Sequence, residues 1–451
     1  MSLWGRYMSF RQIASCWAIL LPVLFPAASN ALPSFAQQTG QPCSQCHVGA
    51  YGPQLKQYGR DFKLYGYVSG DGQNWLPPIS LVTVSSFTHT EADRAKPLPH
   101  FDTNDNTVLI DRAKMAYAGA LPGKVGMFSE LSYDGVRHVL AIDNIDIRRA
   151  FNPTIAGHDV ILGLDLNNRP TIQDLWNSTP TFEFLPTTTP LSPTPNITAV
   201  VDGALAQRVA GYGGYGMWDN FLYAELLGYQ ALNQDFVHRS GIQTTATTDI
   251  YDGVMPYWRV AVQRDFSDRH YLALGVFGMS ADRFPKGIRP DGTDHIADTA
   301  GDLTYQFTGS KQHYWSAHAT YIHENDRLDA SHHLFGSNAS DYLNTMRLDV
   351  SYSYHDQLTP TVEVFQSRGS HDPQFFKTAA GTPDSTGYVV EVAYAIWGIA
   401  SSPVGWSNIR LAVRWIGYSK FNGASSDASG NNTLYVNVRF AVAPFGAAIK
   451  R

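Results

Sequence analysis

The sequence predicts an all-β chain, a 16-stranded antiparallel transmembrane β-barrel with a small α-helical segment before it. Three observations predict this fold. From residue 79 onward, segments of about ten residues alternate apolar and polar side chains, as strands between lipid and a lumen do. Short turns and long loops alternate between these segments. Finally, only 16% of the 451 residues are charged and 13% are aromatic, and the net charge of -6 leaves no basic footprint for nucleic acid.

The alternation is clearest in three segments. In 346–354, Met, Leu, Val and Tyr share one face, and Arg, Asp and Ser share the other. The segments 409–415 and 434–442 repeat this pattern. A soluble β-sandwich also alternates, but it would hide its apolar face in a core and would not need so many strands. Sixteen strands, an even number as in bacterial barrels, are expected at 79–91, 106–120, 125–134, 138–150, 158–168, 200–214, 220–231, 254–265, 269–280, 300–309, 313–323, 342–354, 360–368, 385–397, 407–420 and 431–443.

The connections predict a barrel with two different ends. Short turns are expected at 122–124, 218–220 and 310–312, and long loops at 169–199, 232–253, 281–299, 324–341 and 369–384. Because barrels have short periplasmic turns and long external loops, we expect the long loops outside the cell, with a tight hairpin at 133–136 as the exception. The proline-rich loop 169–199 either folds inward as a constriction or forms an exposed flap.

A barrel of sixteen strands encloses a wide lumen, which in porins is an aqueous channel. Charged residues at inward positions fit the wall of such a porin-like lumen, and solvated pore lining explains each of them. They are Arg112, Lys114, Arg148, Arg259, Arg347, Asp349, Arg410 and Arg414. No segment after residue 31 has the ~18 consecutive apolar residues of a spanning helix.

The first 31 residues have the pattern of a secretory signal peptide. Two arginines precede an apolar run at 18–25, and small residues follow, so we expect cleavage after Ala31. A retained anchor is the alternative, but the apolar run is too short to span a bilayer. The predicted organisation is a signal peptide at 1–31, a small segment at 32–75 and the barrel at 76–451.

The small segment carries Cys43-Ser44-Gln45-Cys46-His47, a C-x-x-C-H motif that attaches c-type haem. Two thiols at this spacing reach the two vinyl groups on one porphyrin edge, and the adjacent histidine becomes an axial ligand of the iron. A zinc site would need further Cys or His ligands, a thioredoxin-like pair would need a βαβ context, and a plain disulfide would leave His47 unexplained. The motif therefore predicts one covalent haem c, held by Cys43, Cys46 and His47.

The residues after the motif predict a helix that begins at Pro53 and ends at Gly66, with apolar side chains at helical spacing. This stripe would cover a haem face or pack on the barrel wall. The segment is too short to bury a haem alone, so we expect the barrel to complete the pocket. The segment either enters the barrel as a plug or hangs beneath its mouth. We expect insertion, because electrons do not tunnel efficiently across a membrane band of ~25 Å, and a haem inside the barrel could exchange them with both sides. No Met or His lies between Val48 and Thr88, so the sixth iron position is filled from the barrel interior, by water or by nothing. One candidate is His318, which occupies an inward position.

The order of signal peptide, monohaem segment and barrel resembles the fused monohaem cytochrome c–porin family of outer-membrane iron oxidases. The local resemblance lies in the small segment, whereas the barrel matches in architecture alone. The matching residues are Pro33-Ser34-Phe35-Ala36, Gln38-Thr39-Gly40, Cys43 to His47, Pro53, Gly59-Arg60, Phe62-Lys63 and Gly66-Tyr67.

The resemblance implies an Fe(II):cytochrome c oxidoreductase in the bacterial outer membrane. Such a protein takes electrons from extracellular Fe(II) and passes them through the haem to a periplasmic c-type cytochrome or copper protein. Cys43 and Cys46 would hold the haem, and His47 would bind its iron. Without the resemblance, the residues leave two alternatives open: an outer-membrane electron conduit for another donor or acceptor, and a transport porin with a haem-bearing redox gate.

Polar residues in the expected outer loops are candidates for contact with cations, although ordinary loop chemistry explains each of them. Outer-sphere electron transfer needs only a brief approach, so a tight iron site is not expected. These residues are Asp291, Asp294, His295, Asp298, His332, His333 and His371.

Overall fold

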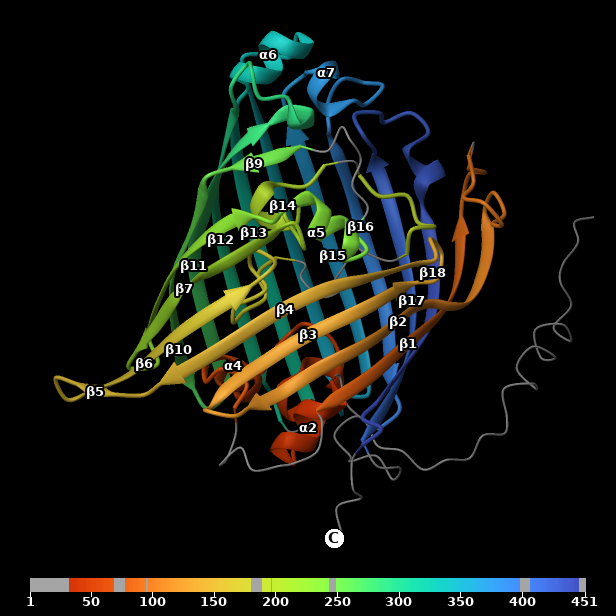
Figure 1. Ribbon diagram of the computed structural model, residues 1–451. Coiled ribbons are helices and arrows are strands. Elements are labelled where there is room, and N and C mark those ends of the chain that lie inside the picture. Colours follow the sequence, from red (N-terminus) through yellow and green to blue (C-terminus); the bar gives the residue numbers. More distant parts are fainter. Residues whose placement is uncertain are drawn as a thin grey trace, which may run out of the picture.

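The computed structural model describes residues 32–68, 78–94, 96–179, 189–195, 197–242, 249–310, 312–397 and 406–445. The expected signal peptide and its cleavage site lie outside these residues. Sixteen long strands follow one another around a closed antiparallel barrel (Figure 1). The barrel closes where β1 (Ile79–Thr90) pairs with β18 (Thr433–Val442). The predicted 16-stranded barrel is therefore confirmed.

The other long strands of the wall are β2 (Asp105–Leu121), β3 (Val125–Asp134), β4 (Val139–Phe151), β6 (His158–Asn167), β7 (Val209–Trp218), β8 (Leu222–Ala231), β10 (Val254–Ser267), β11 (His270–Phe284), β12 (Asp294–Thr308), β13 (His313–Arg327), β14 (Ser340–Tyr354), β15 (Leu358–Gly369), β16 (Ser385–Ala395) and β17 (Ser407–Lys420). Two short strands, β5 (Thr154–Ile155) and β9 (Ile250–Asp252), extend neighbouring hairpins.

The helices are short and lie in the connections and the N-terminal segment. None of the helices among the described residues is long and apolar enough to cross a membrane. They are α2 (Pro33–Thr39), α3 (Cys43–Cys46), α4 (Gln57–Leu64), α5 (Gln234–Arg239), α6 (Asp329–Phe335) and α7 (Pro373–Phe376), with the 3₁₀ turns η1 (Val48–Ala50), η2 (Val200–Asp202), η3 (Pro285–Gly287) and η4 (Ala428–Asn431).

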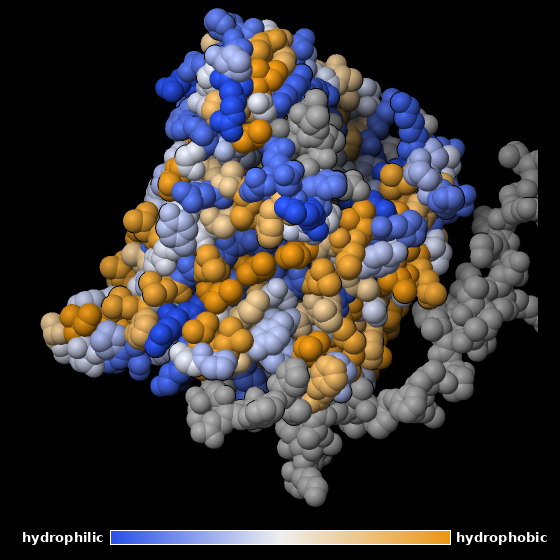
Figure 2. Space-filling view, in the orientation of Figure 1, coloured by the Kyte–Doolittle hydropathy of each residue, from blue (hydrophilic) through white to orange (hydrophobic). Residues whose placement is uncertain are grey.

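The outer surface of the wall is apolar between two rows of aromatic side chains. Strand β14 exposes Tyr342, Met346, Leu348, Val350 and Tyr354 and turns Asp349, Ser351 and Ser353 inward. Strand β16 repeats this order, with exposed tyrosines on either side of exposed valines. Figure 2 shows apolar side chains spread over the strands, while polar ones gather around the loops at the top. An apolar band between aromatic girdles is typical of barrels that sit in a lipid bilayer.

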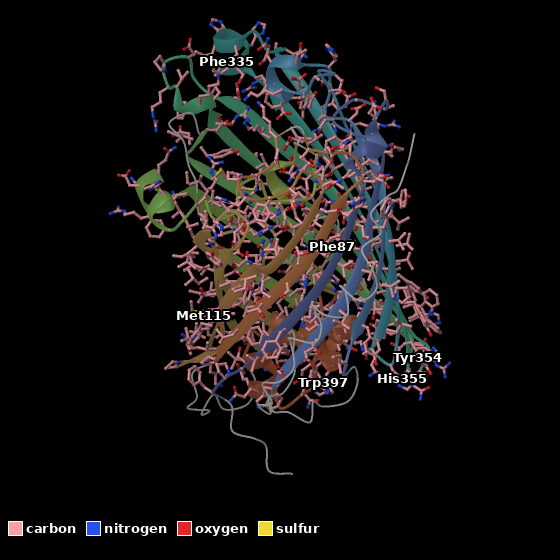
Figure 3. The ribbon with its side chains drawn as sticks, turned by 90° about the vertical axis from the view of Figure 1, so that its right-hand side faces the viewer. Phe87, Met115, Phe335, Tyr354, His355 and Trp397 are labelled. Carbon is pink, nitrogen blue, oxygen red and sulfur yellow. The ribbon has the colours of Figure 1, made fainter. Side chains whose placement is uncertain are left out.

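The two ends of the barrel differ as the loop lengths predicted. Long connections carry α6 and α7 at one end, and short turns lie at the other end, beside α2 and α4 (Figure 1). Figure 3 shows Phe335 of α6 at the long-loop end and Tyr354, His355 and Trp397 at the short-turn end. The expected tight hairpin between β3 and β4 is also present, as a turn at 135–138.

One predicted strand is wrong in its first half. The expected strand 200–214 begins only at Val209, because the residues before it leave the wall and enter the lumen. The backbone N–H of Val200 donates to Glu324 on β13, at 2.7 Å, and that of Val201 donates to Asp298 on β12, at 2.6 Å. An apolar run that reads as a strand is here buried against the inner wall instead.

The connection between β6 and β7 fills part of the lumen, as the constriction alternative predicted for loop 169–199. The Trp176 indole donates to the hydroxyl of Tyr271 on β11, at 2.6 Å. The hydroxyl of Thr320 on β13 donates to the carbonyl oxygen of Ser178, also at 2.6 Å. These bonds tie the described part of the loop to the far wall, so it is not an exposed flap.

Candidate functional site

The N-terminal segment lies inside the short-turn end of the barrel. The rings of Phe35, Phe62 and Tyr67 pack together, with centroids 5.1 Å apart for Phe35 and Phe62 and 5.2 Å apart for Phe35 and Tyr67. This aromatic group joins Ala118 and Phe128 of the barrel wall in one apolar cluster. Burying aromatic surface against the wall stabilises the inserted position.

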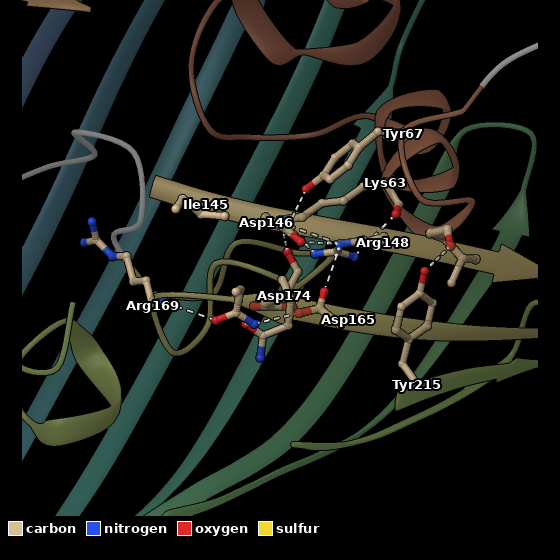
Figure 4. A network of polar contacts seen from close by, with 12 residues as sticks. Lys63, Tyr67, Ile145, Asp146, Arg148, Asp165, Arg169, Asp174 and Tyr215 are labelled. Carbon is tan, nitrogen blue, oxygen red and sulfur yellow. Dashed lines mark hydrogen bonds and ion pairs between the residues drawn. The ribbon is translucent and has the colours of Figure 1, made fainter. Parts of the chain in front are cut away.

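A buried polar network holds the end of the segment to β4 and β6 (Figure 4). The Tyr67 hydroxyl donates to Asp146, at 2.6 Å. The Arg148 guanidinium pairs with Asp146 at 2.7 Å and with Asp165 at 3.1 Å, and all three side chains are fully buried. It also donates to the backbone carbonyl of Lys63, at 3.3 Å. Buried charges need such partners, since an unpaired charge inside a protein is strongly destabilising.

The inward loop holds the other side of the same segment. The Lys63 ammonium donates to the backbone carbonyl of Asp174 at 2.5 Å and to the Asn177 side chain at 2.9 Å. Asn177 in turn donates to the carbonyl of Pro53, at 2.5 Å. Burial lowers the pKa of Lys63 to about 7, with further lowering by Arg148 opposed by nearby carboxylates. Wall, loop and segment therefore form one packed unit.

The C-x-x-C-H motif forms a single helical turn within this unit. The His47 N–H donates to the Cys43 carbonyl at 2.8 Å, which places the histidine directly after α3. Both cysteines are free thiols. The motif is also bound to the wall, because Asn408 on β17 donates to the Ala50 carbonyl at 3.0 Å and to the Cys43 sulfur at 3.9 Å.

The predicted helix start at Pro53 is wrong. The chain stays extended after Pro53 and pairs back on the motif, with an antiparallel bridge between His47 and Leu55. The N–H of Lys56 donates to the Cys46 carbonyl at 2.8 Å, and α4 begins one residue later. Backbone groups of the motif need hydrogen-bond partners. The residues that the sequence pattern assigned to the first helical turn provide these partners and therefore stay extended. The predicted end at Gly66 agrees with its left-handed φ of 70°.

Cys43, Cys46 and His47 line one cavity of about 230 Å³ inside the barrel. The segment and the wall both contribute to it, as the sequence predicted for a pocket completed by the barrel. Its apolar lining comes from the segment and from β1 and β3, and its charged lining from β2, β3, β16, β17 and β18 as well as Lys63. The apolar side chains include Leu32, Phe35, Val48, Leu55, Phe62, Val82 and Phe128.

The chemistry of this lining fits a covalently attached porphyrin. Nδ1 of His47 is buried and has no hydrogen-bond partner. Burial lowers the pKa of His47 to about 4, so the ring is neutral at neutral pH, the form that ligates iron. Burial also raises the pKa of the Cys46 thiol to about 12. The described residues contain no group of three or more His, Cys, Asp or Glu side chains placed to hold a metal ion by themselves.

The structure does not bring His318 to the lining of this cavity. Its ring faces a second, smaller cavity of about 20 Å³, where it lies 3.3 Å from Asp349. Gln54 lies between the two cavities and lines both. Its amide is 2.8 Å from Asp349 and 3.4 Å from the His318 ring. The candidate for the sixth iron position is thus part of the wall beside the site.

Most of the predicted lumen charges are paired with acidic side chains. Lys114 lies 3.4 Å from Glu130. Arg259 pairs with Asp302 at 2.8 Å, and Arg347 pairs with Asp202 of the inward loop. Arg112 is half-buried on the same wall as Lys114. Arg410 and Arg414 both bond to Glu391, and both line the cavity with the motif.

Three of the expected loop residues lie in a strand. Asp294, His295 and Asp298 belong to β12, which extends further toward the long-loop end than the sequence pattern indicated. Asp294 is fully buried and accepts from Arg283 at 2.9 Å, so it is structural. The others lie in connections between strands, as expected, with His332 and His333 on α6 and Asp291 and His371 in loops.

Sequence reasoning missed Arg439, which lines the motif cavity. The alternation in 434–442 predicts that Arg439 points inward. The sequence does not predict that Arg439 shares a cavity with the motif, because this depends on which strand closes the barrel beside the segment. Strand β18 lies there because it pairs with β1, at the far end of the sequence.

No family model matches this chain, and no curated protein matches it. Among solved structures, OmpF of Salmonella typhi in complex with daunomycin is 12% identical, covers 80% of this chain and 96% of its own, and gives a TM-score of 0.47. The anion-selective porin from Comamonas acidovorans is 11% identical, and the match covers 81% of this chain and 98% of the porin, with a TM-score of 0.44. The outer membrane channel DcaP of Acinetobacter baumannii is 10% identical, and the match covers 80% of this chain and 96% of the channel, with a TM-score of 0.45.

Proposed function

We propose that this protein is an outer-membrane electron-transfer protein, an Fe(II):cytochrome c oxidoreductase. It oxidises extracellular Fe(II) and passes the electrons through a c-type haem to a periplasmic c-type cytochrome or copper protein. The observation that carries the proposal is that Cys43, Cys46 and His47 line a cavity inside the lumen of a barrel with a lipid-facing surface. The resemblance of the N-terminal segment to the fused cytochrome–porin family supports the same function.

The residues of the segment have distinct roles in this proposal. Cys43 and Cys46 would form the two thioether links, and His47 would bind the iron through its neutral ring. When bound, the haem carries one electron by alternating between ferrous and ferric iron. The cluster of Phe35, Phe62 and Phe128 excludes water from the cavity, which tunes the reduction potential of the site.

The position of the motif suits electron transfer to an acceptor on the periplasmic side. Within the lumen, the motif reaches the short-turn end. Pro42, Ser44 and Gln45 line a third cavity, which is polar, measures about 690 Å³ and is also lined by residues of the short turns. An acceptor in the periplasm can approach on that side.

The lumen wall toward the long loops suits a cationic donor. Asp298 and Glu324 are direct neighbours on β12 and β13. Asp326 and Asp341 face each other one step further along the wall, and both oxygens of buried Asp326 lack a hydrogen-bond partner. These buried acidic groups lie on the part of the lumen wall from which Fe(II) would approach. Each Fe(II) gives up one electron and leaves as Fe(III), so iron need not enter the cell.

The test is stopped-flow mixing of the oxidised, detergent-solubilised protein with Fe(II), read at the haem absorption bands. We expect reduction of the haem at a rate that rises with the Fe(II) concentration. Cys43→Ser should lose one of the two thioether links, and the double variant Cys43→Ser, Cys46→Ser should lose the covalent haem retained after denaturation. A wild-type protein that retains no covalent porphyrin, or whose haem Fe(II) does not reduce, contradicts the proposal.

Two alternatives use the same parts. An electron conduit for another donor or acceptor would show haem reduction by that donor and none by Fe(II). A transport porin with a haem-bearing redox gate would pass ions through the lumen when reconstituted in planar bilayers. The packed segment and inward loop oppose the second alternative, because they tie both sides of the lumen together near the short-turn end. Conductance that changes on haem reduction would favour it.

A further inference from the structure

The second cavity adjoins the cavity that contains the motif. It measures about 20 Å³, which is enough space for one water molecule. The segment, the inward loop and the barrel wall all contribute to its lining. Pro53, Gln54 and Asn177 line both cavities, so these residues form the partition between them.

Two acidic side chains face each other in the wall of the second cavity. Asp349 on β14 and Glu363 on β15 are direct cross-strand partners, and both line the cavity. They are only 4% and 1% exposed. Two ionised carboxylates in opposite positions repel each other, and the repulsion grows where water is excluded. A proton bound to one of the two groups removes this repulsion.

The surroundings favour a proton on Glu363. Both of its oxygens are buried and have no hydrogen-bond partner among the described residues. Asp349, by contrast, accepts from the Gln54 amide at 2.8 Å. Burying an ionised carboxylate without donors costs far more than burying a neutral carboxylic acid. The geometry therefore places the proton on Glu363 and the negative charge on Asp349.

The charged groups around this pair are directed to other partners. The segment and the inward loop contribute only uncharged side chains to the lining of the second cavity. His318 lies 3.3 Å from Asp349 and does not line the cavity of the motif, so it belongs to this pair and not to the haem site. The neighbouring arginines are each paired with a different carboxylate, and some of these charges also act on Glu363. They are Arg347 with Asp202, Arg414 with Glu391, and Arg259 with Asp302.

Gln54 joins the pair to the motif. Its side chain donates to Asp349, and its carbonyl oxygen accepts from the N–H of Val48 at 3.1 Å. Val48 follows His47 directly, and the next residue after Gln54, Leu55, forms the bridge with His47. Charges interact strongly across a short path from which water is excluded. A change of charge on the group that the motif holds therefore acts on the pair.

We propose that Asp349 and Glu363 form a proton-binding site that holds its proton more tightly when the haem is reduced. This inference rests on the proposed function, since it takes haem as the group that the motif holds and Fe(II) as the electron donor. Where the ferric protein has lost the proton, Fe(II) gives one electron to the haem, and one proton from water binds to a carboxylate oxygen of the pair. When the periplasmic acceptor takes the electron, the proton returns to water. The coupling is reciprocal, so the bound proton raises the reduction potential of the haem.

The test measures the midpoint potential against pH by spectroelectrochemistry on the full-length, haem-loaded protein in detergent. In the wild type, we expect the potential to fall as the pH rises, with a slope of up to one proton per electron, and to level off on both sides of that range. Glu363→Gln should remove this dependence, because the amide cannot take up the proton. Glu363→Asp keeps a carboxyl group and should retain it.

Glu225→Gln is the matched control. Glu225 is also a buried, inward-facing glutamate whose two oxygens lack a hydrogen-bond partner among the described residues, but it lines neither cavity. This variant should keep the pH profile of the wild type. Infrared difference spectra between the ferric and ferrous states give a second readout. We expect the carbonyl band of a protonated carboxyl group to change with the redox state in the wild type and in the control, and to be lost in Glu363→Gln.

A wild-type potential that stays constant with pH would overturn the inference, and so would a folded Glu363→Gln variant that keeps both the pH profile and the carboxyl band. Folding is checked by the heat-dependent gel mobility of the barrel. If this variant does not fold, the wild-type spectra decide, because a carboxyl band that does not respond to the redox state contradicts the inference. In these cases Fe(II) still reduces the haem. A wild-type protein without covalent haem would instead overturn the proposed function itself.

Discussion

At the scale of single residues, a few buried ion pairs help to hold the N-terminal segment against the barrel wall. Arg148 contacts two carboxylates of the wall and the backbone of Lys63, and its side chain has no exposed surface. Its neighbour Arg149 points to the outside of the same strand and is exposed. Two adjacent arginines on β4 thus differ only in the face that they occupy.

This difference gives a first prediction. Arg148→Gln should destabilise the docked segment by about 3–5 kcal/mol, because it leaves the acidic side chains of Asp146 and Asp165 buried without the guanidinium that bonds to both. Hydrogen exchange of residues 57–67 in detergent measures the effect, and we expect clearly faster exchange there. Arg149→Gln is the matched control and should leave exchange unchanged. Equal protection in both variants would show that the ion pairs do not hold the segment.

At the scale of elements, the segment fits the wall closely because β3 has no side chain where the two meet. A Cβ atom added at Gly126 would overlap the carbonyl oxygen of Gly66, just after α4. Gly66 itself has a φ of 70°, a left-handed conformation that glycine adopts without strain. The two glycines let the end of the plug lie directly on the strand.

We therefore predict that Gly126→Ala loosens the plug while the barrel stays folded. Overpacking of this kind costs about 1–3 kcal/mol. Limited proteolysis should cut the segment near Gly66 faster in this variant than in the wild type. Gly301→Ala on β12 is the control, since the nearest atom to its new Cβ lies 3.8 Å away. If the two variants are cut at the same rate, the contact at Gly126 is not what seats the plug.

At the scale of the whole molecule, charge is distributed unevenly along the lumen. Carboxylates such as Asp298 and Glu324 lie on the wall toward the long loops, and arginines such as Arg410 and Arg439 lie beside the motif. In the proposed function, Fe(II) would enter the lumen from the long-loop end, past these acidic groups.

A third prediction follows from that order. The double variant Asp298→Asn, Glu324→Gln keeps an oxygen acceptor for the backbone N–H groups of Val200 and Val201 but removes both acidic groups. Haem reduction by Fe(II) should slow by roughly tenfold at low ionic strength, and by less in salt. Reduction by an uncharged hydroquinone should not change. Asp268→Asn, an exposed residue at the short-turn end, is the control. A double variant that reacts with Fe(II) at the wild-type rate would exclude electrostatic attraction by these residues.

The sequence alone determined the number of strands and the motif. Alternation in segments such as 346–354 does not depend on which strands lie beside them, since the period of a strand is a local property of its backbone. The segment 407–420 and the hairpin at 122–124 were likewise predictable. The spacing from Cys43 to His47 is local too, and it predicts haem attachment without reference to the fold.

The tertiary structure decided what those local patterns surround. Residues 200–208 read as a strand but enter the lumen, because carboxylates on β12 and β13 bind their backbone. Pro53 reads as a helix start but lies in a segment that pairs back on His47. The juxtaposition of Arg410 and Arg439 beside the motif exists only because the last strands close the barrel next to the first. Contacts between residues hundreds of positions apart depend on closure and register, which no local period encodes.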